Sequence, residues 1–182
     1  MKKLFTILCA ATLTLSMSAQ TQWGATAGLN MANVSEGDGD MKPGVHIGIS
    51  ADVLLSDAMS LKTGALYSMK GSTSGDVSLN INYIEIPCLL SFAVSDQMSL
   101  MVGTYTGFLM GANASGGGFS LDLTDAMSGI DFGIDVGAGF AVSEVISINA
   151  GYQIGLTALD KDGAGDSKNS NIHIGMTYSF GG

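Results

Sequence analysis

Hydrophobic and polar residues alternate along most of the chain beyond residue 20. In the first such segment Trp23, Ala25 and Leu29 alternate with Gly24 and Thr26. Strict alternation over about ten residues is typical of strands that cross a membrane in a β-barrel, one face toward lipid and the other inward. The pattern recurs in segments 44–53, 59–70, 83–92, 100–110, 130–140, 146–156 and 171–180. These segments predict an all-β fold, an eight-stranded antiparallel up-and-down transmembrane β-barrel.

One stretch breaks this regularity. From Val77 to Ile81 the apolar residues occupy odd positions, whereas from Ile84 to Phe92 they occupy even positions. A change of parity within one strand is expected where an extra residue is inserted. The sequence therefore predicts a β-bulge near Tyr83.

The connections between these segments differ in length. Outer-membrane barrels have short periplasmic turns and longer external loops. Short connections are expected at Leu54–Ala58, Ala93–Gln97 and Ser143–Val145, a medium one at Gly71–Asp76, and long ones at Ala32–Pro43, Gly111–Gly129 and Thr157–Ser170. An even number of strands then places both chain ends on the periplasmic side.

Aromatic residues are expected in two bands on the apolar face, where membrane interfaces accommodate them. The periplasmic band comprises Trp23, Phe92, Phe140 and Phe180, and the opposite band Tyr67 and Phe108. A soluble barrel around a ligand would give the same alternation with its faces reversed. Its outer face would then carry mostly Gly, Ser, Asn and Thr with few charges, which suits a soluble surface poorly. The membrane barrel is therefore favoured.

The first residues resemble an export signal. Lys2 and Lys3 precede an apolar stretch, Leu4–Leu15, and small residues follow. This order is typical of a secretory signal peptide, and the apolar stretch is too short to span a bilayer. We expect residues 1–19 to be the signal peptide, cleaved after Ala19 or alternatively after Ser18, and residues 20–182 to be the barrel domain in the outer membrane of a Gram-negative bacterium.

Composition excludes some other classes of protein. The chain is 46% hydrophobic, yet beyond the signal segment it has no apolar run long enough for a transmembrane helix. The formal net charge is −9 and the sequence contains no Arg, which argues against a nucleic-acid partner. Cys88 alone would remain after cleavage, so an intramolecular disulfide is not expected.

The inward face is expected to carry most of the charged groups of the strands. An eight-stranded barrel is just wide enough for side chains to fill it, so they should form a hydrogen-bonded, ion-paired plug, with a narrow path for water, ions or protons as the alternative. We expect Asp52 opposite Ser60, Glu85 opposite Tyr105, and Lys62 or Lys70 near Glu85. The candidate interior residues are His46, Asp52, Lys62, Lys70, Glu85, Tyr105, Asp131, Asp135 and His173.

Four segments resemble the PorT-like family of outer-membrane β-barrel domains. They are NYIEIPCLLSF from Asn82, SLKTGALYSMKG from Ser60, GTYTGFLMG from Gly103 and DFGIDVGAGF from Asp131. The resemblance implies an eight-stranded barrel in the outer membrane. One member of that family is associated with protein secretion, and many others have no assigned activity. The chain departs from such barrels in continuing past the final aromatic residue with two glycines.

No motif indicates an enzyme. His46 and Ser50 share a face, but no spacing defines the nucleophile, base and orienting group that a hydrolase needs, and neither a cofactor nor a metal site is predicted. We expect a structural or surface-interaction role for a monomer in outer-membrane lipid, with external loops that can contact a protein partner. The alternative is a narrow channel or an accessory component of transport or protein secretion.

Overall fold

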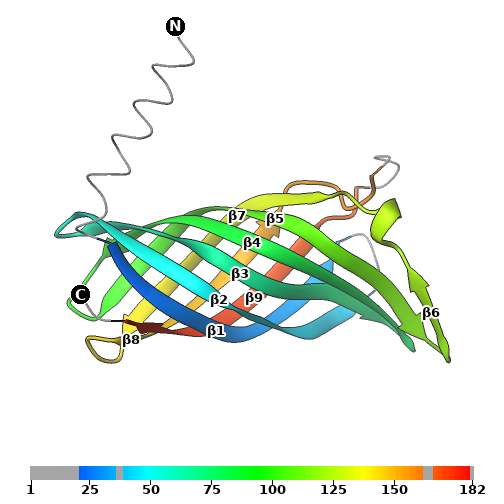
Figure 1. The fold of residues 1–182 in the computed structure, drawn as a ribbon, viewed down its shortest axis with the longest axis horizontal. Coiled ribbons are helices and arrows are strands. Elements are labelled where there is room, and N and C mark those ends of the chain that lie inside the picture. Colours follow the sequence, from blue (N-terminus) through cyan, green and yellow to red (C-terminus); the bar gives the residue numbers. More distant parts are fainter. Residues whose placement is uncertain (1–20, 36–38, 162–165, 181–182) are drawn as a thin grey trace, which may run out of the picture.

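The computed structural model describes residues 21–35, 39–161 and 166–180, and the predicted signal peptide lies outside these residues. A ring of antiparallel strands forms a closed barrel, because β4 pairs with both β3 and β5 (Figure 1). The ring contains β1 (Thr21–Val34), β2 (Asp40–Ser56), β3 (Met59–Ser74), β4 (Val77–Ala93), β5 (Met98–Gly116), β7 (Ile130–Ala141), β8 (Ile146–Gly155) and β9 (Asn169–Ser179). The predicted eight-stranded fold is confirmed.

The start of β1 and the end of β9 lie at the same end of the barrel, called the terminal end below. There the amide of Phe180 donates to the carbonyl of Trp23 at 2.8 Å. The β2–β3, β4–β5 and β7–β8 turns at this end are short, as predicted. Two are stabilised by serine: Ser95 Oγ accepts the amide of Met98 at 3.0 Å, and Ser143 Oγ accepts that of Ile146 at 3.1 Å.

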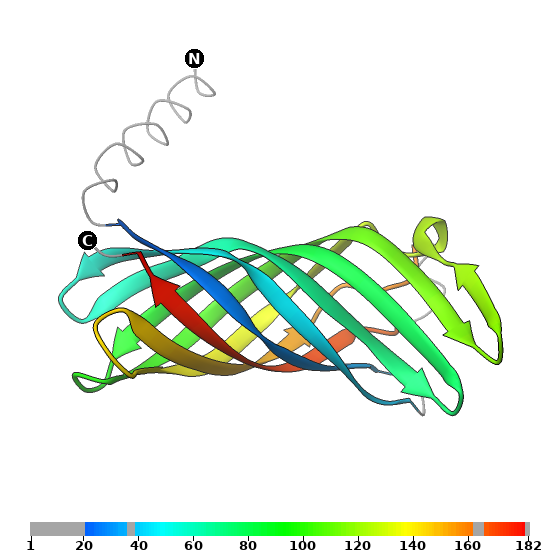
Figure 2. The same ribbon diagram turned by 60° about the horizontal axis from the view of Figure 1, so that its bottom comes forward.

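The opposite end of the barrel is called the distal end. There the strands continue further than the alternation indicated. The predicted connection Gly71–Asp76 is mostly strand, and only Gly75, with φ +56°, and Asp76 form the turn. Part of the predicted loop Gly111–Gly129 extends β5 and adds a short strand, β6 (Phe119–Asp122), and a 3-10 helix, η2 (Thr124–Ala126). The β3–β4 and β5–β6 hairpins project furthest at this end (Figure 2). No described helix is long and apolar enough to cross a membrane.

The two faces of the wall differ as the alternation predicts. Ile134 and Ile148 on the outer face are 39% and 40% exposed, whereas inward-facing Asp135 is 3% exposed. All the predicted girdle aromatics, together with many aliphatic side chains, lie on the outer face. An apolar outer belt around a polar interior is the arrangement that a lipid bilayer requires.

A register shift occurs beside Tyr83, where a bulge was predicted, but its extra residue is not in β4. The extra residue is in the neighbouring strand β5, because Tyr83 pairs with Leu109 and Asn82 with Gly111, which leaves Met110 unpaired. Strand β4 keeps one parity, so Ile81, at 0% exposure, faces inward like Tyr83. The chemistry of the two faces changes instead: distal to Tyr83 the outward residues are polar and the inward ones apolar. This reversal is expected where a strand leaves lipid and its outer face meets water.

Two predicted pairings are also wrong. Asp52 lies opposite Lys62 rather than Ser60, and Glu85 lies opposite Gly107 rather than Tyr105. Each turn is centred one residue further along the chain than expected. In an antiparallel pair such a displacement shifts the register by two residues, which preserves the facing of every side chain but changes its partner.

Candidate functional site

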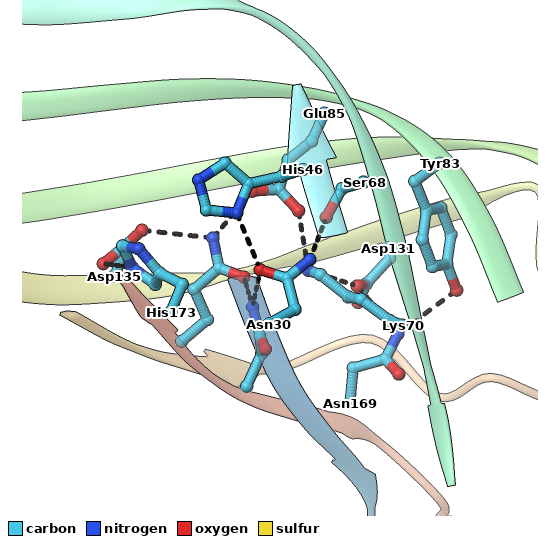
Figure 3. A network of polar contacts seen from close by, with 12 residues as sticks. Asn30, His46, Ser68, Lys70, Tyr83, Glu85, Asp131, Asp135, Asn169 and His173 are labelled. Atoms are coloured by element: carbon cyan, nitrogen blue, oxygen red, sulfur yellow. Dashed lines mark hydrogen bonds and ion pairs between the residues drawn. The ribbon is translucent and has the colours of Figure 1, made fainter. Parts of the chain in front are cut away.

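Lys70 lies at the centre of a polar network that fills the middle of the barrel (Figure 3). Its Nζ is 2.7 Å from Glu85 Oε2 and 3.7 Å from Asp131 Oδ2, and all three side chains are buried. The ammonium group also lies 4.1 Å from the centre of the Tyr105 ring, a cation–π distance. A buried lysine is costly without partners, and two carboxylates and an aromatic face supply them.

Amide side chains from other strands connect to these charged groups. Gln153 of β8 donates through Nε2 to Glu85 at 2.7 Å and to Asp135 at 3.1 Å. Asn169 of β9 donates through Nδ2 to Asp131 at 2.9 Å. Asn171 donates to the side-chain oxygens of Gln153 and Asn30 at 3.1 and 3.2 Å. The two N–H groups of one amide can donate to two different carboxylates, so Gln153 links Glu85 and Asp135, which would otherwise repel each other.

The two histidines lie toward the terminal side of this network. His46 Nδ1 is 3.0 Å from Asn30 Oδ1, and His173 Nε2 is 3.2 Å from Asp135 Oδ1. Their rings meet edge to face, with centroids 6.1 Å apart. His46 therefore binds an asparagine, while Ser50 accepts a hydrogen bond from Thr26 at 3.1 Å. This is not the serine–histidine contact that a hydrolytic site would need.

Glycines on the inward face provide the room for these rings. A Cβ on Gly151 would lie 2.6 Å from His173 Nε2, and one on Gly175 would lie 2.7 Å from His46 Nε2. A Cβ on Gly107 would lie 3.1 Å from the Tyr83 ring. The many inward glycines are thus explained by close packing between strands and rings across a narrow interior.

An apolar cluster lies on the distal side of the network. Ile81, Tyr83, Ala112 and Leu159 are its buried members. Tyr83 joins the two layers, because its ring belongs to the cluster and its hydroxyl accepts Asn169 Nδ2 at 3.2 Å. Leu159 comes from the β8–β9 connection, which bridges to the β6–β7 connection: the amide of Ser128 donates to the carbonyl of Leu159 at 2.7 Å. The distal mouth is therefore closed by side chains and by two loops.

The terminal half of the interior is hollow by comparison. Two neighbouring hollows of about 100 and 220 Å³ share Ser50, Lys62, Asn149 and Thr177 in their lining. Lys62 forms an ion pair with Asp52 here, and both side chains are partly exposed. The inner hollow ends against His46, Glu85 and Asp135. The interior is a cup that opens at the terminal end and ends at the network.

The structure places all the candidate interior residues on the inward face, in two groups. Asp52 and Lys62 lie in the hollow half, and the others lie in or beside the network. Sequence reasoning did not select the amide residues that link the charged groups: Asn30, Gln153, Asn169 and Asn171. Their inward parity was visible, and Asn169, Asn171 and His173 are successive inward positions of one strand.

A closed barrel with an apolar belt and a polar interior defines this protein as a transmembrane β-barrel of the outer membrane. The chain belongs to the family described as outer membrane protein beta-barrel domain, whose model matches residues 5–180.

Solved structures agree in fold. Neisserial surface protein A (NspA) is similar with a TM-score of 0.60 and 15% identity, over 88% of this chain and 97% of that one. Ail, the attachment invasion locus protein of Yersinia pestis, is similar with a TM-score of 0.57 and 17% identity, over 88% and 99%. At such identities the likeness shows the fold alone. A search of curated proteins finds no match.

Proposed function

We propose that this protein is a surface-interaction barrel that binds a partner at its distal end and neither conducts solutes nor catalyses a reaction. The observation that carries the proposal is the asymmetry of the barrel. Its interior is closed on the distal side by the Lys70 network and the Ile81 cluster. Beyond this closure the β3–β4 and β5–β6 hairpins continue as a projecting wall (Figure 2). A channel would not need such a wall, whereas a binding surface would.

The names of the similar structures support an interaction role. One is called a surface protein and the other an attachment invasion locus protein, and the latter is also known in complex with the heparin analogue sucrose octasulfate. A polysulfated ligand requires cationic groups. This chain has no Arg and a net charge of −9. We therefore propose a partner that carries positive charge, unlike the polysulfated ligand.

The orientation in the membrane is part of the proposal. The terminal end faces the periplasm, the distal end faces outward, and the aromatic bands mark the two interfaces. Residues 1–19 direct export and are removed, and the barrel is a monomer. Intact mass of the mature protein tests the cleavage site, since a chain that retains Lys2 and Lys3 contradicts it.

Single-channel recording of the purified barrel in planar bilayers tests the closed interior. We expect no steady conductance in salt solution at either polarity. Lys70→Gly combined with Tyr105→Gly, which removes side chains from the network, is the positive control and should increase ion leakage. Steady conductance of the unmodified protein would contradict the proposal and favour the channel.

A second candidate is an accessory role in secretion, as a member of the PorT-like branch of the family. Two observations favour it: the cup that opens at the terminal end, and the resemblance of the segment Tyr83–Pro87. A deletion strain separates the two roles. Loss of secreted proteins from the medium supports the accessory role, and unchanged secretion with loss of surface binding supports the interaction role.

A further inference from the structure

The projecting wall has an exposed apolar inner face. Leu79 on β4 pairs with Ala114 on β5, which pairs with Leu121 on β6, and paired residues share a face. This is the face of buried Ile81 and Ala112. Yet Phe119 and Leu121 are 54% and 55% exposed. Lipid does not account for these two side chains, because they point toward the barrel axis and the outward residues of the same wall are polar.

The face continues into an apolar pocket. Val34, Leu79, Leu123, Met127 and Leu159 line most of it, and its volume is about 310 Å³. Much of its wall comes from the β6–β7 and β8–β9 connections. Lys161 N donates to Ala126 O at 3.1 Å between these two loops, and Leu159 N donates to Ser167 O at 2.8 Å within the β8–β9 connection. The pocket has room for a bulky apolar side chain beside the exposed sheet face.

The same wall ends in an open strand edge. Strand β6 pairs with β5 alone among the described strands. Gly117 and Gly118, with φ +56° and +84°, form the two-residue turn between them, so Gly116 and Phe119 are the hydrogen-bonded pair nearest the turn. Because hydrogen-bonded and non-bonded pairs alternate, the backbone groups of Ser120 and Asp122 point to the open edge. An extended segment can add to such an edge.

The charges near this edge indicate the partner's chemistry. Asp122 ends β6, Asp125 follows in η2, and Asp76 lies at the tip of the adjacent hairpin. Lys161 is directed to the backbone, since its Nζ donates to the carbonyl of Asp125 at 3.4 Å. Acidic groups at the edge favour a partner that carries positive charges on either side of its apolar residues.

We propose that β6 is the docking strand for an extended segment of a protein partner, apolar at alternate positions and flanked by basic residues. The segment pairs with the edge at Ser120 and Asp122, lays apolar side chains on Phe119 and Leu121, and inserts one into the pocket. This proposal rests on the surface-interaction function and names the site and the class of partner.

A labelled synthetic peptide, in which valine alternates with threonine between pairs of lysines, tests the proposal on the full barrel in lipid nanodiscs. Fluorescence anisotropy should show saturable binding. Leu121→Thr should weaken it about tenfold or more, the factor that corresponds to 1.4 kcal/mol. Asn113→Thr, on the outward face of the neighbouring strand β5, is the matched control and should leave it unchanged. In amide NMR spectra the signals of Ser120 and Asp122 should shift on binding.

Chemically altered peptides separate this mode from other kinds of binding. Methylation of alternate backbone nitrogens along the pairing edge, and replacement of the lysines by glutamates, should each abolish binding. If the methylated peptide binds equally well, or if Leu121→Thr has no effect, strand addition at β6 is refuted. Self-association of the barrel through this edge in sedimentation experiments, abolished by Leu121→Thr, would also overturn the proposal in favour of a second copy. If the barrel does not conduct ions and the peptide does not bind, the docking site alone is refuted. If the barrel conducts steadily, the proposed function is refuted.

Discussion

Replacing Lys70 by methionine should destabilise the barrel strongly. Methionine keeps much of the unbranched apolar side chain, so the loss of packing is small. The charge is lost, however, and Glu85 and Asp131 remain buried with no cation in contact; their distances to Lys70 Nζ are 2.7 and 3.7 Å. Breaking a buried ion pair by removing one partner costs about 3–5 kcal/mol, and we expect Lys70→Met to fall in this range.

The partly exposed ion pair in the hollow half provides the matched control. Lys62 and Asp52 have side-chain exposures of 29% and 28%, so solvent screens their charges and Lys62→Met should cost about 1 kcal/mol or less. Combining Lys70→Met with Glu85→Gln and Asp131→Asn removes the unpaired charges and should restore most of the lost stability.

Reversible urea unfolding in lipid vesicles, followed by the mobility of folded and unfolded forms on gels, measures these differences. The reasoning is refuted if Lys70→Met costs no more than Lys62→Met. It is also refuted if the triple variant is less stable than Lys70→Met alone, because unpaired carboxylates could not then be the source of the loss.

Three further predictions concern facing, packing and orientation. Ile134→Lys on the lipid face should cost about 2–4 kcal/mol in vesicle unfolding, and an equal cost for Ile134→Ala would contradict a lipid environment. Gly151→Ala should cost about 1–3 kcal/mol because the facing histidine ring must move; Gly129→Ala, which has open space around it, is the control and should be nearly neutral. In a cysteine-free background, a cysteine at Ser120 should react with an impermeant maleimide on whole cells and one at Asp57 should not; the reverse result would invert the orientation.

Alternation was sufficient to predict the barrel because each strand meets lipid on one face and a narrow interior on the other. It failed at Val77–Ile81, where the same alternation continues in water and the apolar face turns inward. A bulge and a passage of the strand from lipid into water produce the same change of parity in the sequence. The polar outward residues Asn80 and Asn82 were the available signal for the second explanation.

The contacts between inward side chains were less predictable than the face of the wall on which each side chain lies. Asp52 and Lys62 were expected to be diagonal neighbours and are direct ones, since the turn between them is centred one residue later than expected. The link from Gln153 of β8 to Glu85 of β4 crosses the interior between strands that are not neighbours in the ring. Such contacts depend on the stagger of the whole barrel, which no single segment encodes.

Leu159→Ala should separate the stability of the distal closure from that of the barrel. Leu159 is 4% exposed within the Ile81 cluster, and burying such a side chain is worth about 1.5–3 kcal/mol. Its carbonyl accepts Ser128 N of the β6–β7 connection at 2.7 Å, and its amide donates to Ser167 O within its own connection at 2.8 Å.

The ladders of β7, β8 and β9 do not depend on this contact, because they and the Lys70 network lie on the terminal side of it. The loops should therefore open locally while the barrel stays folded, as expected for a region with few buried contacts of its own. Hydrogen exchange should show faster exchange at the Ser128 and Leu159 amides with unchanged protection in β7 and β8, and the urea midpoint should stay the same. If instead the urea midpoint falls and protection is lost along β8, the distal closure and the barrel are one cooperative unit. The loops could then not rearrange around a docked segment without weakening the barrel itself.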